Sequence, residues 1–335
     1  MKIAIIGGAG FVGSHVTSAY LNAGHDVFVV DSLAHSVRES VDSRARFYHL
    51  DIRDAKLQTV LQAERPDIVS YHVVQREHTL PCESSLIDAD VHIRGLLNVL
   101  DSCVNAQVAK FIFASGGNSL YKRSSLQVWD AAVPVHEEIE VCPLHPQDIS
   151  KVAGEWYVRY YARQYGLPYL ILRYADIYGE IDAKRAWHPL TAFMTHILQK
   201  RRPAIRGTDR DVRDHIFIDD VVRANFCALG RGRNETLHIS SGQGYTLKQF
   251  YHTVTRLLQS EITPAYISAS PTEPTGIILD NRRAQRVLNW RPEIDFLHGV
   301  GLSVERLCGQ RMEAHTEPLS LEELESTSTR SAVLV

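Results

Sequence analysis

Short apolar runs alternate with stretches of helical periodicity along the first half of the chain. The runs cover residues 2–6, 27–31, 46–51, 68–74, 110–114 and 169–174. Helical spacing follows the first glycines and covers residues 55–64, 85–104 and 147–165. Strand and helix units of this length are typical of a parallel sheet covered on both faces, with ligands beyond the carboxyl ends of the strands. The pattern therefore predicts an α/β fold with a doubly wound parallel sheet.

Beyond residue 175 the alternation is less regular. Helical spacing covers residues 190–199, 247–258 and 282–288 and a last stretch that ends near residue 310, while short apolar runs end at residues 218 and 239. We expect residues 1–175 to form the sheet domain, joined by helices from later segments, and residues 176–311 to form a smaller α/β lobe. Residues 312–335, rich in Glu, Ser and Thr without an apolar face, are expected to be disordered.

A glycine-rich turn follows the first apolar run and leads directly into helical spacing. It reads Gly7-Gly8-Ala9-Gly10-Phe11-Val12-Gly13. Gly7 permits the tight turn, Gly10 lets backbone N–H groups approach a pyrophosphate, and Gly13 lets the helix pack against the strand. The helix N-terminus at Phe11 and Val12 adds partial positive charge where phosphates would bind. This arrangement predicts a Rossmann-type dinucleotide site.

An acidic residue ends the second apolar run, where a ribose-binding carboxylate is expected. Asp31 stands 18 residues after Gly13 and is followed by Ser32. A carboxylate here accepts hydrogen bonds from both ribose hydroxyls and repels a 2′-phosphate, so the predicted cofactor is NAD rather than NADP. Asp51 and Ile52 end the third run beside the expected adenine, although Asp51 alternatively caps the helix after it.

Composition argues against several classes of function. The chain has 335 residues and a net charge of −3, so it offers no basic surface for nucleic acid. Its five cysteines lack CxxC or Cys/His ligand spacing and are odd in number, and these two features together indicate a reducing compartment and no structural zinc. Met1 leads directly into the first strand, which leaves no room for a signal peptide, and no apolar stretch approaches the ~20 residues of a membrane span. We therefore expect a cytoplasmic protein with no membrane partner.

Several motifs taken together resemble one family. They are the glycine-rich turn, Asp31-Ser32-Leu33, Asp51-Ile52-Arg53-Asp54, Phe111-Ile112-Phe113-Ala114-Ser115, Pro146 with Ser150-Lys151, Leu172-Arg173-Tyr174, Arg213-Asp214 and Leu288-Asn289-Trp290-Arg291-Pro292. On these motifs residues 1 to about 310 resemble the extended short-chain dehydrogenase/reductases, most closely the NAD-dependent sugar-nucleotide epimerases and dehydratases. The resemblance implies a bound NAD that takes a hydride from a carbon of a nucleotide sugar and usually returns it.

The resemblance also implies a homodimer, because members of the family commonly associate through two long helices. Here these would be residues 85–104 and the helix that carries Lys151. The apolar positions that permit this are Leu96, Leu97, Val99, Leu100, Val152, Trp156, Tyr157 and Tyr160. Burial within one chain explains these positions equally well.

The family's chemistry requires a tyrosine, a lysine four residues after it, and a serine or threonine near the fifth strand. Lys151 matches the lysine, but Gln147 stands at the tyrosine position. A glycine stands at the hydroxyl position, which is Gly116 counted from the strand or Gly117 counted back from Tyr121. An amide does not titrate near neutral pH, so Gln147 cannot act as a general base. The chain is therefore expected to lack the usual proton acceptor.

Other residues are candidates for that acceptor. Tyr121 is one, although a buried tyrosine normally ties its hydroxyl to the backbone, which favours a structural role. Lys151 would serve if burial lowers its pKa, but ribose binding is the simpler role. Asp148 is interpreted as an acid of the first helical turn that points away from Lys151. The remaining candidates, each more often a solvated loop residue, are Asp176, Glu180, Glu77, His78 and His188.

Asp176, His188 and Arg213 are the candidate substrate-binding residues. Asp176 stands where the family has an asparagine that contacts the substrate diphosphate. A carboxylate there repels the diphosphate by ~4 kcal/mol, taking two unit charges 4 Å apart at an effective dielectric near 20, unless a cation intervenes. Arg213 matches the family's diphosphate-binding arginine, or alternatively forms only a surface ion pair with Asp214. Ser115, at the end of the fifth apolar run, is a candidate contact for the cofactor.

Two hypotheses follow. The first is an atypical NAD-dependent epimerase, dehydratase or reductase acting on a nucleotide sugar, with Lys151, Gln147, Gly116 and Tyr121 as the candidate catalytic positions. The second is a catalytically silent NAD-binding sensor, scaffold or partner subunit. The first is preferred because Lys151 and Arg213 are retained, and this preference depends largely on analogy of fold.

Overall fold

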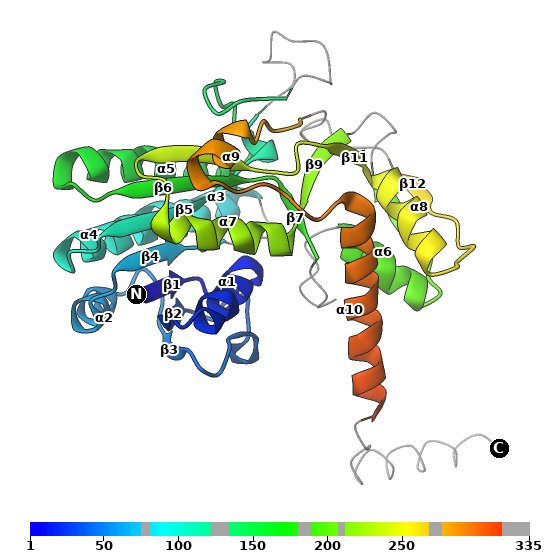
Figure 1. Ribbon diagram of the computed structural model, residues 1–335, viewed down its shortest axis with the longest axis horizontal. Helices are drawn as coiled ribbons and strands as arrows, with labels where there is room; N and C mark the ends of the chain where they lie inside the picture. Colours follow the sequence, from blue (N-terminus) through cyan, green and yellow to red (C-terminus); the bar gives the residue numbers. More distant parts are fainter. Residues whose placement is uncertain (75–80, 122–133, 180–188, 207–211, 268–276, 317–335) are drawn as a thin grey trace.

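A parallel sheet of seven strands runs through the larger part of the molecule (Figure 1). The computed structural model describes residues 1–74, 81–121, 134–179, 189–206, 212–267 and 277–316. The strand order is β10-β6-β5-β4-β1-β2-β3, and all neighbours are parallel. The strands are β1 (Lys2–Ile6), β2 (Asp26–Asp31), β3 (Arg46–His49), β4 (Ile68–Tyr71), β5 (Lys110–Gly116), β6 (Tyr169–Tyr174) and β10 (Glu235–Ile239). The predicted doubly wound parallel sheet is confirmed.

The direction of winding reverses between β1 and β4. Successive strands β1, β2 and β3 run toward one edge, whereas β4, β5, β6 and β10 run toward the other. The chain segments that leave β1 and β4 therefore diverge above the carboxyl ends of the strands, and such a reversal leaves a crevice in which α/β proteins bind ligands.

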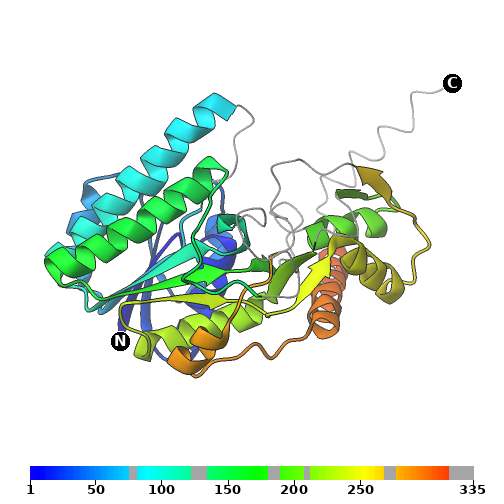
Figure 2. The same cartoon turned by 90° about the horizontal axis from the view of Figure 1, so that it is seen from above.

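Helices cover both faces of the sheet, as Figure 2 shows from above. Alternate residues of each strand point to opposite faces, so Ile3 and Ile5 join one apolar core while Ala4 and Ile6 join the other. One face carries α2 (Lys56–Glu64), α3 (Pro81–Ala89), α4 (Leu96–Asn105) and α5 (Pro146–Tyr165). The other carries α1 (Phe11–Asn22), α7 (Ile218–Gly230) and α9 (Arg282–Leu288).

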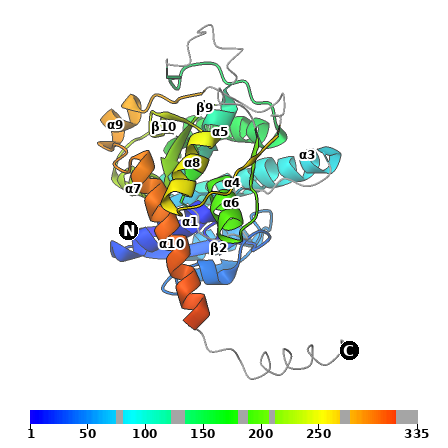
Figure 3. The same ribbon diagram turned by 90° about the vertical axis from the view of Figure 1, so that its right-hand side faces the viewer.

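A smaller lobe lies beyond one end of the sheet (Figures 1 and 2). It holds a three-stranded sheet in the order β11-β9-β7 and a two-stranded sheet of β12 and β8. Its elements are β7 (Asp176–Tyr178), α6 (Pro189–Leu198), β8 (Ala204–Arg206), β9 (Val212–Phe217), β11 (Gly244–Thr246), α8 (Leu247–Leu257), β12 (Ala265–Ile267) and α10 (Phe296–Thr316). Figure 3 shows the last turns of α10 projecting from the lobe.

Some element boundaries differ from the prediction. The fourth strand ends at Tyr71 and not at residue 74. The neighbouring strand β1 ends at Ile6, whose carbonyl oxygen accepts from the His72 N–H. The helix expected over residues 85–104 is interrupted by a π-helical segment, Asp90–Gly95. The short strands β7, β8, β11 and β12 were not predicted, since runs of three residues carry no periodic signal. Helix α10 continues to Thr316, past the expected lobe boundary at residue 311.

Candidate active site

The glycine-rich turn occupies the reversal between β1 and β4. Gly7 has φ +80°, and a Cβ there would lie 2.9 Å from the carbonyl carbon of His72. A Cβ on Gly13 would lie 2.4 Å from the Gly7 carbonyl oxygen, so side chains at both positions would push the turn away from its neighbours. Gly10 precedes the first residue of α1, and its backbone faces a cavity with Phe11 and Val12. The turn thus brings backbone and a helix N-terminus to the cavity wall, as an anionic ligand requires.

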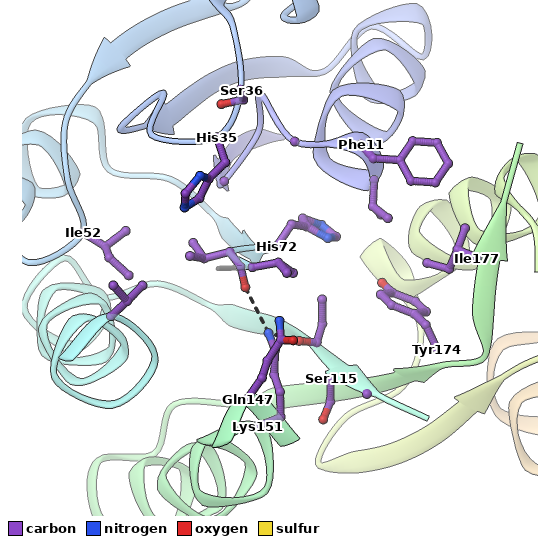
Figure 4. Close-up of a pocket in the computed structure, with 18 of the residues that line it drawn as sticks. Phe11, His35, Ser36, Ile52, His72, Ser115, Gln147, Lys151, Tyr174 and Ile177 are labelled. Carbon is purple, nitrogen blue, oxygen red and sulfur yellow. Dashed lines mark hydrogen bonds between the residues drawn. The ribbon is translucent and has the colours of Figure 1, made fainter. Parts of the chain in front are cut away.

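That cavity has a volume of about 460 Å³ and lies above the carboxyl ends of the central strands (Figure 4). Of the predicted cofactor residues, all except Gly13 line it. They are Gly7, Gly10, Phe11, Val12, Asp31, Ser32, Asp51, Ile52, Ser115 and Lys151. The fold therefore brings to one cavity residues that are far apart in the sequence.

Asp31 is held in place by hydrogen bonds at the end of β2. Its Oδ2 accepts from the backbone N–H of Ala9 at 2.9 Å, and its Oδ1 accepts from the N–H of Leu33 at 2.8 Å and from Ser36 Oγ at 3.0 Å. These bonds tie the carboxylate to the glycine-rich turn, so the ribose and phosphate ends of a dinucleotide would meet a preorganised surface. The loop after β2 also brings Ser32 and His35 to the cavity.

Asp51 contacts an arginine in the structure. Its carboxylate accepts from Arg53 Nε at 2.8 Å and Nη2 at 2.6 Å, while Arg53 Nη1 donates to Asp90 at 2.6 Å. Arg53 lowers the pKa of Asp51, chiefly through this side-chain hydrogen bond. The alternative role as a helix cap is not observed, because α2 begins at Lys56, whose N–H donates to Asp54.

Lys151 lies at the opposite end of the cavity. Its ammonium group donates to the carbonyl oxygens of Val73 at 3.0 Å and Ala114 at 3.1 Å, which places it between the ends of β4 and β5. Burial lowers the pKa of Lys151 to about 8, while Asp88 acts in the opposite direction. Figure 4 shows Gln147 and Lys151 side by side on α5, with Ser115 nearby. The amide therefore stands beside the lysine on the cavity wall, as helical spacing predicts.

The structure distinguishes the two glycines that the sequence left as alternatives. A Cβ on Gly117 would lie 2.2 Å from the Tyr174 carbonyl oxygen, so this backbone admits no side chain there. A Cβ on Gly116 would have its nearest neighbour, Ser119 Oγ, at 3.1 Å. Both glycines line the cavity. Gly116 is thus the less obstructed of the two positions, although a side chain there would require Ser119 to shift slightly.

Tyr121, a candidate catalytic position, does not line the cavity, and its place in the fold corrects that expectation. Its buried hydroxyl accepts from Arg173 Nη1 at 2.6 Å and lies 2.8 Å from His238 Nε2. Arg173 in turn donates to both carboxylate oxygens of Glu155, at 2.8 and 2.7 Å. Burial raises the pKa of Tyr121 well above its usual value. The structure therefore places Tyr121 in a buried polar network, which is the structural alternative.

Asp148 also differs from the interpretation made from sequence. It lies in the first turn of α5, as expected, but it lines the cavity instead of pointing away from Lys151. Residues three apart on a helix are neighbours on its surface, so Asp148 and Lys151 share a face. Ser119 Oγ donates to Asp148 Oδ1 at 2.6 Å. Ser119 was missed because only the folded turn Asn118–Leu120 brings it to α5.

At the border of the smaller lobe, Asp176 and Arg213 lie opposite each other. They occupy the paired strands β7 and β9, and Arg213 Nη1 lies 3.9 Å from Asp176 Oδ2. Asp176 lines the cavity. The alternative prediction, a surface ion pair of Arg213 with Asp214, is wrong because Asp214 is buried. Its carboxylate accepts from the backbone N–H groups of Ser241, Gly242 and Leu279. The candidates Glu77, His78, Glu180 and His188 lie outside the described residues.

His72 and Tyr174 also line the cavity and were not predicted as site residues. His72 lies 2.8 Å from Ser70 Oγ through Nε2, and burial lowers the pKa of His72 to about 3, so its ring is neutral at pH 7. Within the described part of the chain, no group of three or more His, Cys, Asp or Glu side chains could hold a metal ion. No described helix is long and apolar enough to cross a membrane.

Comparison with known proteins identifies relatives along most of the chain. Residues 3–240 match the model of the NAD dependent epimerase/dehydratase family. The UDP-glucose 4-epimerase of Mycolicibacterium smegmatis is 27% identical over 312 residues, covering 91% of this chain and 98% of that protein. The crystal structure of Thermotoga maritima UDP-glucose 4-epimerase with UDP-glucose superposes with a TM-score of 0.87 and 32% identity, covering 93% of this chain and 100% of the other. The Thermus thermophilus UDP-glucose 4-epimerase complex with NAD has a TM-score of 0.83 and 27% identity, covering 92% and 99%.

These comparisons confirm the prediction that the cofactor is NAD. They also confirm the first of the two hypotheses, that the protein is an enzyme, at the level of the family. They give no support to a catalytically silent binding protein. The cavity fits NAD, since a glycine turn that admits no Cβ at Gly13 lies at one end and a buried lysine lies at the other. In fold, motifs and relatives, the chain belongs to the NAD dependent epimerase/dehydratase family.

Proposed function

We propose that this protein is an NAD-dependent enzyme that modifies a nucleotide sugar without the tyrosine base typical of its family. The observation that carries the proposal is the cavity wall formed by α5, where Gln147 and not a tyrosine stands one turn before Lys151. An amide can donate and accept hydrogen bonds but cannot take a proton near neutral pH. Gln147 would therefore orient a sugar hydroxyl without deprotonating it.

The chain's own residues would hold the cofactor at both ends. Asp31 would accept from the adenosine ribose, and the N-terminus of α1 would face the pyrophosphate. Lys151 would donate to the nicotinamide ribose from its place between Val73 and Ala114. When bound, NAD supplies a hydride acceptor at its nicotinamide ring.

We infer that the substrate carries a diphosphate, and UDP-glucose and UDP-galactose are the first candidates. The relatives named above are UDP-glucose 4-epimerases, and one of them was crystallised with UDP-glucose. Arg213 supports this inference, because its cation lies beside Asp176 and offsets the repulsion that this carboxylate would exert on a diphosphate. Arg213 would thus bind the substrate from the smaller lobe.

Turnover of nucleotide sugars tests the proposal directly. Purified protein is incubated with NAD and a panel of UDP-, dTDP-, GDP- and CDP-sugars, while the absorbance of reduced nicotinamide and the masses and stereochemistry of the products are followed. We expect turnover of at least one UDP-sugar, and loss of both NAD binding and turnover in Asp31→Ala. Asp42→Ala, which removes an acid that does not line the cavity, is the matched control. Tight NAD binding without turnover of any sugar would refute the proposal.

We also propose a homodimer that forms through α5. Leu96, Val99 and Leu100 are buried within one chain, so they are not available for a partner. Trp156 and Tyr160, by contrast, are 62% and 45% exposed on one face of α5. Light scattering on the wild type and on Trp156→Glu with Tyr160→Glu tests this; we expect the variant to be monomeric, and a monomeric wild type would refute the dimer.

The division of the chain near residue 175 and the location of the protein in the cell are the last parts of the proposal. The strand β10 belongs to the large sheet although it follows residue 175. We propose that residues 1–175, with β10 and the helices that return to the sheet, bind NAD, and that the remaining part of residues 176–311 binds the substrate. We propose a cytoplasmic location, which the free thiols of Cys103, Cys142, Cys227 and Cys308 support. Fractionation of cells with an antibody against the protein tests the location.

A further inference from the structure

We propose that Ser119 and Asp148 form the proton-transfer pair that replaces the missing serine or threonine and tyrosine. This inference rests on the proposed function, since it concerns the sugar hydroxyl of the same reaction. Each residue stands close to a position that lost its functional group: Ser119 three residues after Gly116, and Asp148 directly after Gln147. The chemistry is thereby retained by neighbouring residues.

The hydroxyl of Ser119 occupies the space beside Gly116. A Cβ built on Gly116 would lie 3.1 Å from Ser119 Oγ, so the hydroxyl stands where a side chain from position 116 would point. The short helical turn η3 (Asn118–Leu120) directs Ser119 back toward the end of β5. Gly116 and Ser119 both line the cavity. A glycine at position 116 leaves room for this hydroxyl.

Asp148 is the residue to which Ser119 donates. The Ser119 Oγ to Asp148 Oδ1 distance is 2.6 Å, which is typical of a hydroxyl bonded to a carboxylate. Asp148 is 8% exposed and lines the cavity in the same helical turn as Gln147 and Lys151. The negative charge of Asp148 also acts on Lys151 and raises its pKa against the effect of burial. A carboxylate, a hydroxyl and an ammonium group thus face one end of the cavity.

The transfer of the sugar hydroxyl proton requires only Ser119 and Asp148, and no further reagent. The O–H bond of the sugar hydroxyl breaks and its proton passes to Ser119 Oγ, while the Ser119 proton passes to Asp148 and forms the O–H bond of a carboxylic acid. When bound, NAD would supply the acceptor for the hydride, so that the electron pair of the adjacent sugar C–H bond would leave with its hydrogen and the carbon would become a ketone. On return of the hydride, Asp148 gives the proton back through Ser119.

Four variants test the assignment in the full-length protein with NAD and whichever nucleotide sugar the wild type turns over. Asp148→Asn removes the acceptor and Ser119→Ala removes the hydroxyl. Asp42→Asn and Ser303→Ala make the same chemical changes at residues outside the cavity wall. We expect Asp148→Asn to lower kcat about 10²- to 10⁴-fold, and Ser119→Ala to lower it by a smaller factor. The KM and the dissociation constant for NAD should not change, and the two control variants should match the wild type.

Chemical rescue separates proton transfer from a structural role. Asp148→Ala leaves space for a small carboxylate, so added formate should restore part of its turnover, and chloride at equal ionic strength should not. Wild-type kcat in both Asp148→Asn and Ser119→Ala would overturn the assignment but leave the proposed function standing. A loss of kcat that follows a loss of folded protein or of NAD binding, without rescue by formate, would also overturn it. A wild type without any turnover would overturn the proposed function and the pair together.

Discussion

Replacing Glu155 by glutamine tests whether a buried ion pair holds α5 against the sheet. Glu155 is 1% exposed and accepts from Arg173 through both carboxylate oxygens. Ser115 Oγ also donates to Glu155, at 2.7 Å. The pair therefore links α5, which carries Gln147 and Lys151, to the ends of β5 and β6.

The expected loss in the free energy of unfolding follows from the burial of Glu155 and Arg173. Glu155→Gln leaves the guanidinium of Arg173, which is 4% exposed, without its counter-charge. Breaking a buried pair by removing one partner costs about 3–5 kcal/mol. With a denaturant slope of about 3 kcal/mol per M of urea, the unfolding midpoint should fall by roughly 1–1.7 M. Exposed pairs are worth at most about 1 kcal/mol, so Glu138→Gln, whose side chain is 77% exposed beside Arg283, should shift the midpoint much less.

Urea denaturation followed by circular dichroism measures both variants. The double variant Glu155→Met with Arg173→Met removes both charges and should be destabilised by less than the sum of the single changes. NAD affinity should also fall in Glu155→Gln, because Ser115 and α5 lose a shared anchor. If Glu155→Gln and Glu138→Gln shift the midpoint equally, the reasoning from burial is refuted.

Three further predictions concern the cavity itself. Gly117→Ala should destabilise the protein by about 1–3 kcal/mol through overpacking against Tyr174, whereas Gly116→Ala should cost less, and comparison of their unfolding free energies checks this. Asp31→Asn should shift the ratio of NADP to NAD dissociation constants toward NADP by about tenfold or more, since the charge that repels the 2′-phosphate is removed; an unchanged ratio in titration calorimetry would contradict it. Burial lowers the pKa of Lys151 from 10.5, its value in an unfolded chain, to about 8. Between pH 8 and 10.5 the unfolded chain therefore binds more protons than the folded protein, and the free energy of unfolding of the wild type rises with pH. Relative to Lys151→Met, the wild type should gain about 3 kcal/mol between pH 8 and 10.5, and parallel pH profiles would contradict this.

Much of the fold was predictable because its causes are local. A run of apolar residues that ends in glycines forms a strand and a turn wherever it lies, and Asp31 follows its strand by covalent order alone. Lys151 and Gln147 share a face because helical geometry repeats every turn. The parallel sheet of the first half of the chain, the glycine turn and most of the cofactor wall could therefore be derived from residue order. That β10 joins the edge of this sheet beside β6 could not, because it lies in the segment expected to form the smaller lobe.

The chemistry at the far end of the cavity depended on contacts between segments distant in sequence. Ser119 meets Asp148 only because η3 folds back onto α5, and Arg213 meets Asp176 only because β9 pairs with β7. Tyr121 is drawn into a buried network by Arg173, whose desolvated charge requires partners. Periodicity reports which face of an element is apolar, but which polar groups come together depends on how the elements pack.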